Sequence, residues 1–176
     1  MLDSLLSAIE QYETKNVFES ATREQFLQFI RAFGALSLER ANLTGHLTAS
    51  GWIIDQETKS RVLLLKHAKL NKWLQPGGHA DGDDDLFRVA QKEVQEETGI
   101  IVQAAQGEIF DLDVHAIPVY KDIPAHLHFD VRYLFLVSSE TPLVISHESK
   151  ELRWVSIKEI NALGVDESVL RMAAKL

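Results

Sequence analysis

The sequence contains no cysteine among its 176 residues. This absence excludes disulfide bonds, thiolate metal ligands and cysteine nucleophiles. The first segment, MLDSLLSAIEQYETK, also lacks a basic stretch and a long apolar run, so we expect neither a signal peptide nor a membrane span. We therefore expect a cytoplasmic location.

Positive charge is scarce, because 18 Lys and Arg residues oppose 26 Asp and Glu residues and leave a formal net charge of −8. Since nucleic-acid phosphates attract basic surfaces, we expect no non-specific binding to nucleic acid. A phosphate-bearing small molecule would need a cation between itself and such a protein. The length and the hydrophobic content of 45% suit one main domain with an appendage.

Residues 1–45 differ from the rest of the chain, because their apolar residues recur at helical spacing. The first run comprises Leu2, Leu5, Leu6 and Ile9. The second run, from Phe26 to Phe33, follows Thr22-Arg-Glu-Gln25, a capping-box pattern that predicts the start of a helix. We expect this helical extension to pack on the core of the main domain. A homodimer surface is the alternative role.

Residues 46–176 form the predicted main domain, where the pattern changes to short β-rich runs. HLTASGWIID and SRVLLLKH are separated by a polar turn and predict a hairpin. Three later runs predict further strands: GEIFDLDVHAIP, AHLHFDVRYLFLVS and ELRWVSI. A helix from Glu167 to Lys175 is expected at the end of the chain.

A helix predicted from Leu86 onward places two carboxylates among apolar side chains. At about 100° per residue, Glu93 and Glu97 fall on the apolar face and Glu96 lies at its edge. A buried carboxylate is costly unless it is paired, and no Lys or Arg shares this face. We therefore expect a divalent cation, and oxygen ligands favour Mg²⁺ or Mn²⁺.

The loop before this helix is rich in glycine and aspartate. Pro76-Gly77-Gly78 permits a tight turn that brings backbone close to a ligand. Asp83 or Asp84 is expected to cap the start of the helix, and Gly99 is expected to end it.

The stretch GHADGDDDLFRVAQKEVQEETGI, from Gly78 to Ile100, resembles the Nudix box. That box has a glycine, five residues, Glu, seven residues, and then Arg-Glu-apolar-any-Glu-Glu-any-Gly-apolar. The spacing agrees throughout, with Asp84 in place of the first Glu and Lys92 in place of the Arg. A pattern with so many fixed positions is a specific signal.

The resemblance implies an α/β (α+β) fold, the Nudix fold, with a mixed sheet sandwiched between helices. It implies hydrolysis of nucleoside diphosphates linked to another group, with Mg²⁺ or Mn²⁺ held by Glu93, Glu96 and Glu97 and by the Gly78 carbonyl. In the family, the general base comes either from the box or from a later loop. Glu148 is our candidate for the base, and Glu96 and Glu151 are the alternatives.

A polar strand face is predicted around HLHFD, where His126, His128, Asp130 and Arg132 alternate with apolar residues. Solvent or a cleft can explain such a face. Together with His79, which follows Gly78, we predict His126, His128 and Arg132 as substrate contacts.

Two other functions remain as alternatives. Isopentenyl-diphosphate isomerase shares the implied fold but relies on a cysteine, which this chain lacks. A non-catalytic Nudix module that senses a nucleotide tends to lose the metal-binding carboxylates, whereas all three are present here. The group beyond the diphosphate is not specified by the sequence, because no subfamily signature matches.

Overall fold

The computed structural model describes residues 2–14, 16–104 and 107–176, and its elements follow in chain order. The helices are α1 (Leu2–Gln11), α2 (Val17–Phe33), α3 (Leu86–Thr98) and α4 (Glu167–Ala173), with 3-10 turns η1 (Gly34–Leu38) and η2 (Ile157–Leu163). The strands are β1 (Gly45–Asp55), β2 (Arg61–His67), β3 (Trp73–Leu74), β4 (Gly77–His79), β5 (Ile109–Ile117), β6 (His126–Val137) and β7 (Ser149–Ser156).

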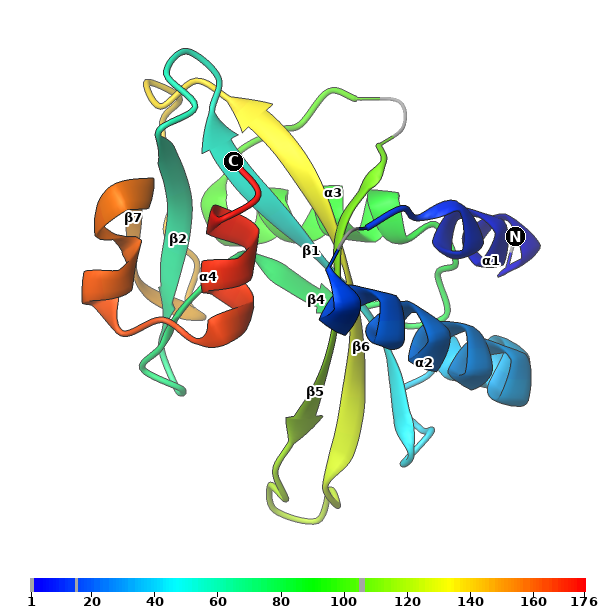
Figure 1. The fold of residues 1–176 in the computed structure, drawn as a ribbon. Coiled ribbons are helices and arrows are strands. Elements are labelled where there is room, and N and C mark those ends of the chain that lie inside the picture. The colour runs from blue at the N-terminus through cyan, green and yellow to red at the C-terminus, as the bar shows by residue number, and fades with distance from the viewer. Residues whose placement is uncertain (1, 15, 105–106) are drawn as a thin grey trace.

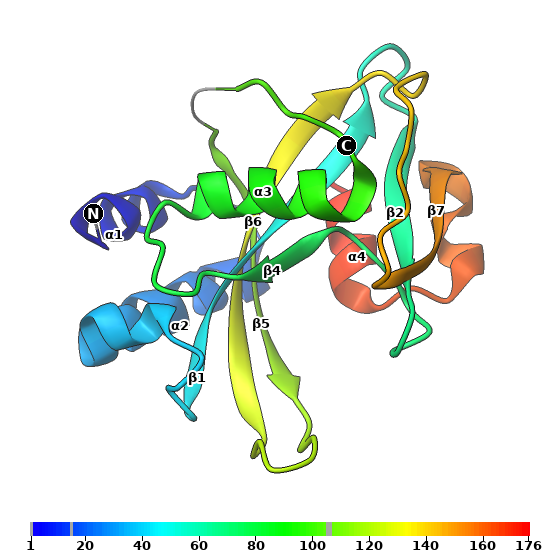
Figure 2. The ribbon, with the colours of Figure 1, turned by 180° about the vertical axis from the view of Figure 1, so that it is seen from behind.

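The strands form one mixed, seven-stranded sheet of order β3-β2-β1-β6-β5. β1 runs parallel to β6 along its whole length, and its other edge pairs first with β4 and then with β2. β7 pairs with the free edge of β2. Helix α3 lies on one side of the sheet and α4 on the other (Figures 1 and 2). The predicted hairpin, the later strands and the mixed sheet between helices are confirmed.

Helix α2 begins at Val17, so the helix start predicted from Thr22 was wrong. The side chain of Asn16 caps the helix, because its Oδ1 accepts a hydrogen bond from Phe18 N at 2.9 Å. Thr22 lies inside the helix and donates its hydroxyl hydrogen to the Phe18 carbonyl at 3.0 Å. A threonine within a helix can satisfy its hydroxyl in this way, so a capping-box pattern alone does not fix the helix start.

The N-terminal helices share a hydrophobic core with the rest of the chain. The ring of Phe29 stacks on that of Phe129 in β6 with centroids 4.0 Å apart, and Phe26 meets Phe129 edge-on at 5.3 Å. The same core contains residues of α1 and α3, such as Leu5 and Val94. The expectation that the extension packs on the main domain is therefore confirmed. None of the described helices combines the length and the apolar character needed to cross a membrane.

The beginnings of β1 and β6 have one apolar and one polar face. Leu47, Phe129 and Val131 belong to the apolar core that includes α3, whereas the alternate residues there are polar. Farther along both strands the second face also becomes apolar and joins a second hydrophobic core with α4. On the polar face, Asp130 accepts hydrogen bonds from the hydroxyls of Thr48 at 3.0 Å and Ser50 at 2.9 Å. The predicted polar face of β6 is present, but this part of it lies inside the protein.

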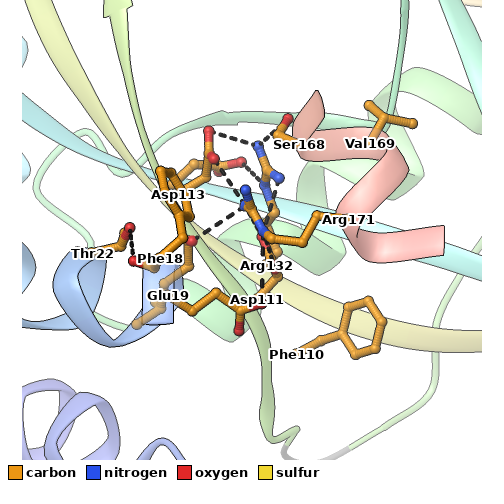
Figure 3. Close-up of polar contacts among 12 residues, drawn as sticks. Phe18, Glu19, Thr22, Phe110, Asp111, Asp113, Arg132, Ser168, Val169 and Arg171 are labelled. Carbon is orange, nitrogen blue, oxygen red and sulfur yellow. Dashed lines mark hydrogen bonds and ion pairs between the residues drawn. The ribbon is translucent and has the colours of Figure 1, made fainter. Parts of the chain in front are cut away.

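A buried ion network around Arg132 occupies this interior (Figure 3). The Arg132 side chain is 2% exposed, and its guanidinium lies 2.7 Å from Asp130, 3.2 Å from Asp111 and 3.1 Å from Asp113. Burial alone would lower the pKa of Arg132, but the three carboxylates outweigh it and raise the pKa. A substrate could reach this guanidinium only by displacing these partners. We therefore do not propose Arg132 as a substrate contact.

The same network joins elements that are distant in the sequence. Arg171 of α4 lies 2.7 Å from Asp111 and 2.9 Å from Asp113, both on β5. Lys175 lies 2.6 Å from Asp111 and 2.9 Å from Glu19 of α2. These contacts hold α2 and α4 on the sheet, and the stability of the arrangement depends on each charge having a partner.

Candidate functional site

Helix α3 is held between two well-defined caps. Asp85 is the N-cap, because its Oδ1 accepts a hydrogen bond from Arg88 N at 3.0 Å, so the prediction of Asp83 or Asp84 as the cap was wrong. The carboxylate of Asp83 instead pairs with the Arg88 side chain at 2.7 Å. Gly99 ends the helix with a positive φ of 77°, as predicted. These caps define the ends of α3, and the packing of its apolar side chains in the core sets the direction of its glutamates.

Glu97 projects from α3 toward the start of β4. Its residue is 8% exposed, and its Oε2 accepts a hydrogen bond from the backbone N–H of Gly77 at 2.9 Å. Burial raises the pKa of Glu97 to about 7, the Gly77 N–H opposes this rise, and the charges of Glu93 and Glu148 add to it. Glu97 is therefore a carboxylate whose negative charge is poorly compensated.

Glu93 lies against the backbone of Gly78, one turn before Glu97. A Cβ atom at Gly78 would stand 2.5 Å from Cδ of Glu93 and 2.6 Å from its Oε1, so a side chain there would displace the carboxylate. Burial also raises the pKa of Glu93. Because Gly78 has no side chain, the Glu93 carboxylate can lie close to the backbone of β4.

Glu96 is exposed and turns toward Lys92, whose Nζ lies 3.6 Å from its Oε1 and 4.0 Å from Oε1 of Glu93. Within the described part of the chain, the three glutamates are not a group whose ligand atoms already lie close enough together to hold a metal ion. They nevertheless offer an all-oxygen donor set beside a glycine backbone, which fits Mg²⁺ or Mn²⁺. The single turn between Glu93 and Glu97 places both on the same side of the helix.

The loop that carries Glu148 lies close to these glutamates. The charge of Glu148 contributes to the raised pKa values of both Glu93 and Glu97, after burial as the first cause. The loop is anchored by a hydrogen bond from Ala68 N to the Glu148 carbonyl at 2.8 Å, and the carboxylate itself is exposed. Glu151, the alternative candidate, is bound by Arg153, which donates from Nε at 2.8 Å. Glu148 is thus near enough to act on the carboxylates of α3, whereas the carboxylate of Glu151 is already bound by Arg153.

The predicted histidines lie on the other face of the sheet. His79 pairs with Thr48 of β1, so its side chain shares the polar face, whereas the preceding Gly78 faces Glu93. His128 is the Cα partner of His46 on the same polar face. Nδ1 of His126 donates a hydrogen bond to the Pro124 carbonyl, 2.9 Å away. The structure therefore groups His79, His126 and His128 with each other and separates them from the glutamates.

Comparison with known proteins decides the family. A family model described as NUDIX domain matches residues 44–175. The chain belongs to the Nudix family of hydrolases. A curated relative, the m7GpppN-mRNA hydrolase NUDT17 of Xenopus laevis, is 30% identical over 96 residues, which cover 51% of this chain and 32% of that protein. This chain thus spans about a third of the length of that relative.

Solved Nudix structures agree with the fold. The MutT NUDIX hydrolase of Burkholderia pseudomallei has a TM-score of 0.60 at 17% identity, with 75% of this chain and 98% of that chain covered. An Ap4A hydrolase of C. elegans in a binary complex has a TM-score of 0.53 at 17% identity, with 73% and 93% covered. At these identities the likeness establishes the Nudix fold alone.

Arg40 lies near the Nudix glutamates, a position that could not be predicted from the sequence. It follows η1 and donates two hydrogen bonds to the carboxylate of Asp81, in the loop after β4. The charges of Glu93 and Glu148 help to raise its pKa, after the hydrogen bond to Asp81 as the first cause. No local pattern signals this cation, because 41 positions separate it from its partner. The N-terminal extension therefore adds a positive charge to the rim of the carboxylate site.

Proposed function

We propose that this Nudix protein is a divalent-metal-dependent hydrolase of a phosphoanhydride bond, acting on a nucleoside diphosphate linked to another group. The observation that carries the proposal is the pair of inward-directed carboxylates, Glu93 and Glu97, beside the glycine backbone of β4. Two such groups one helical turn apart with raised pKa values favour a bound cation. The family membership supports the same reaction class.

Each residue has a distinct role in the proposed reaction, in which water attacks phosphorus. Glu93, Glu96 and Glu97, with the Gly78 carbonyl, would hold Mg²⁺ or Mn²⁺. Bound there, the ion offsets the negative charge of the phosphates and of the leaving oxygen. Glu148 accepts the proton of the attacking water from its loop, and Glu96 is the alternative base. The Arg40 guanidinium at the rim supplies a further positive charge for a substrate phosphate.

Glu148→Gln is expected to lower the turnover number more than tenfold at saturating Mg²⁺, a loss of at least about 1.4 kcal/mol in transition-state stabilisation. The amide keeps the size of the side chain but cannot accept the proton. Because Glu148 is exposed, the variant should unfold at the temperature of the wild type. Steady-state rates and thermal unfolding of both proteins measure the two effects.

Glu151→Gln is the matched control for the base, because Glu151 is an exposed acid on the adjoining strand that Arg153 already binds. We expect its turnover to stay within about twofold of wild type. A loss below tenfold in Glu148→Gln, or an equal loss in both variants, would exclude Glu148 as the base. Glu96→Gln would then be measured in the same assay.

The substrate class is tested by a screen with Mg²⁺ and with Mn²⁺. The panel contains nucleoside triphosphates, ADP-ribose, sugar nucleotides, dinucleoside polyphosphates and an m7GpppN cap dinucleotide. We expect hydrolysis of at least one member, with a nucleoside monophosphate or diphosphate as product. The net charge of −8 favours small nucleotides over long nucleic acid as substrates. Binding of a nucleotide without hydrolysis of any would overturn the proposal and support the nucleotide-sensing alternative.

A further inference from the structure

Three histidines from three strands bring their ring nitrogens together on the face of β4 that points away from α3. One ligand atom from each of His46, His79 and His128 lies within 4.8 Å of those of the other two. The register accounts for this, because His46 is the Cα partner of His128, and His79 is the partner of Thr48. Residues two positions apart on a strand, such as His46 and Thr48, share a face.

Three ring nitrogens in this cluster are buried without a hydrogen-bond partner among the described residues. His46 is 3% exposed, and neither of its ring nitrogens has a partner of good geometry among the described residues, although the nearby Asn42 backbone offsets part of its pKa lowering. Nε2 of His128 is also buried without a partner in the described chain. A buried polar atom without a partner costs about 1–3 kcal/mol. Unpartnered atoms in a group of ring nitrogens this close together indicate a ligand that would satisfy them.

The rings are in the protonation state that metal binding requires. Burial, followed by the charge of His79, lowers the pKa of His128 to about 2. Burial, followed by the charge of Arg40, lowers the pKa of His79 to about 4. Burial also lowers the pKa of His46. The three imidazoles are therefore neutral near pH 7, and a metal ion need displace no proton from them.

We propose that His46, His79 and His128 form a binding site for a transition-metal ion of the Zn²⁺ class. Imidazole nitrogen is a ligand for Zn²⁺, Ni²⁺ and Cu²⁺, whereas Mg²⁺ prefers oxygen. The three nitrogens lie within 4.8 Å of one another, a spacing that small side-chain rotations convert to Zn–N bonds of about 2.0–2.1 Å. Three protein ligands leave a fourth position for water or a substrate oxygen.

The surroundings of the cluster suit such an ion. His126 lies next to it, with its ring centroid 4.9 Å from that of His46, and its Nδ1 is held by the Pro124 carbonyl. A backbone carbonyl on Nδ1 leaves Nε2 as the free nitrogen, the arrangement found around metal-binding histidines. In Figures 1 and 2 the starts of β1 and β6 and the end of β5 lie at the same end of the sheet, away from α3.

This site is separate from the carboxylates of α3. Gly78 faces Glu93 across one side of β4, and the next residue, His79, points to the opposite side. The two sites also differ in ligand chemistry, since one offers oxygen and the other nitrogen. The histidine site therefore does not depend on the proposed hydrolysis.

Titration of the metal-free 176-residue chain with Co²⁺ and Zn²⁺ in excess Mg²⁺ tests the proposal. We expect one equivalent of Co²⁺ to bind with the visible absorption of a tetrahedral site, and Zn²⁺ to displace it. His46→Gln, His79→Gln and His128→Gln should each weaken binding by more than the roughly 10–100-fold that loss of an outer-shell partner costs. No saturable binding, or binding that all three variants retain, would overturn the proposal.

Two controls separate the site from its neighbours. His115→Gln changes a ring 5.4 Å from His128, but Nδ1 of His115 already pairs with Asp113, so zinc affinity should not change. Glu97→Gln alters the opposite side of β4 and should also keep wild-type zinc affinity. Loss of zinc binding in Glu97→Gln with retention in the histidine variants would assign the ion to the carboxylates instead.

A measurement on the wild-type protein avoids reliance on variants that fold poorly. ¹⁵N NMR of the imidazole rings should show that Zn²⁺ shifts the nitrogens of three histidines, with those of His67 and His147 unchanged. His67 already accepts backbone hydrogen bonds at Nδ1 from Lys69 and Leu70, and His147 is exposed. Zinc-dependent shifts confined to His67 and His147 would contradict the site.

Discussion

Glu97→Gln is expected to lower the metal-dependent turnover about a thousandfold, which corresponds to about 4 kcal/mol of activation free energy. The variant keeps the hydrogen bond from Gly77, because the amide oxygen can accept it, but loses the negative charge that would hold the cation. The rate is measured at saturating Mg²⁺ with the substrate that the screen identifies. Retained activity would refute the metal assignment.

The same variant should be more stable than wild type when metal is removed with a chelator. The pKa of Glu97 is about 7 in the folded protein and about 4.3 in the unfolded chain, so the folded state binds the extra proton. Stability from this group is therefore present at low pH and is lost as pH rises through about 7. Glutamine does not titrate, so we expect the free energy of unfolding of Glu97→Gln to exceed that of wild type by about 1–3 kcal/mol at pH 8.

The gain should be small at pH 5 and full above pH 7, as measured by urea unfolding at both pH values. Glu140→Gln is the control, because Glu140 is an exposed acid in the turn after β6. We expect neither its activity nor its stability to change. A loss of activity together with a loss of stability in Glu97→Gln would indicate a structural role for the carboxylate.

Arg132→Met is expected to destabilise the protein by about 3–5 kcal/mol, because it removes one partner of a buried ion network. Asp111, Asp113 and Asp130 would be left with less compensating charge inside the protein. Arg171 still contacts Asp111 and Asp113, so Asp130 suffers the largest loss. Urea unfolding of the purified variant measures the change in the free energy of unfolding.

Arg153→Met is the matched control for Arg132→Met. Its pair with Glu151 is exposed on β7, where ion pairs contribute about 0–1 kcal/mol. We expect its stability to stay close to that of wild type. If Arg132→Met kept wild-type stability and instead raised the Michaelis constant for a nucleotide, the predicted substrate contact would be supported after all.

The glutamates of α3 could be predicted from the sequence because their direction depends on local geometry. A helix of known period carries Glu93 and Glu97 to the apolar side wherever the helix packs. The ends of the helices were harder to predict, because neighbouring polar residues compete to be the cap. Asn16 and Asp85 are the caps in the structure, in place of the residues chosen from the pattern.

The contacts between segments distant in the chain could not be predicted from the sequence. The strand alternation correctly placed His128 and Arg132 on one face of β6. It could not show that β5 and α4 surround Arg132 with charge, or that β1 and β4 bring His46 and His79 to His128. Those neighbours are set by strand pairing and register, which a single sequence does not reveal.

The alternation of side chains along β4 links the two predicted ion sites. Gly78 must face α3 to admit Glu93, and His79 must face the opposite side to meet His46. Because side chains alternate with a period of two, deletion of one residue between Pro76 and His79 would reverse both directions. The side chain of His79 would then point toward Glu93 and away from His46 and His128. The length of this short segment, as much as its composition, therefore specifies both sites.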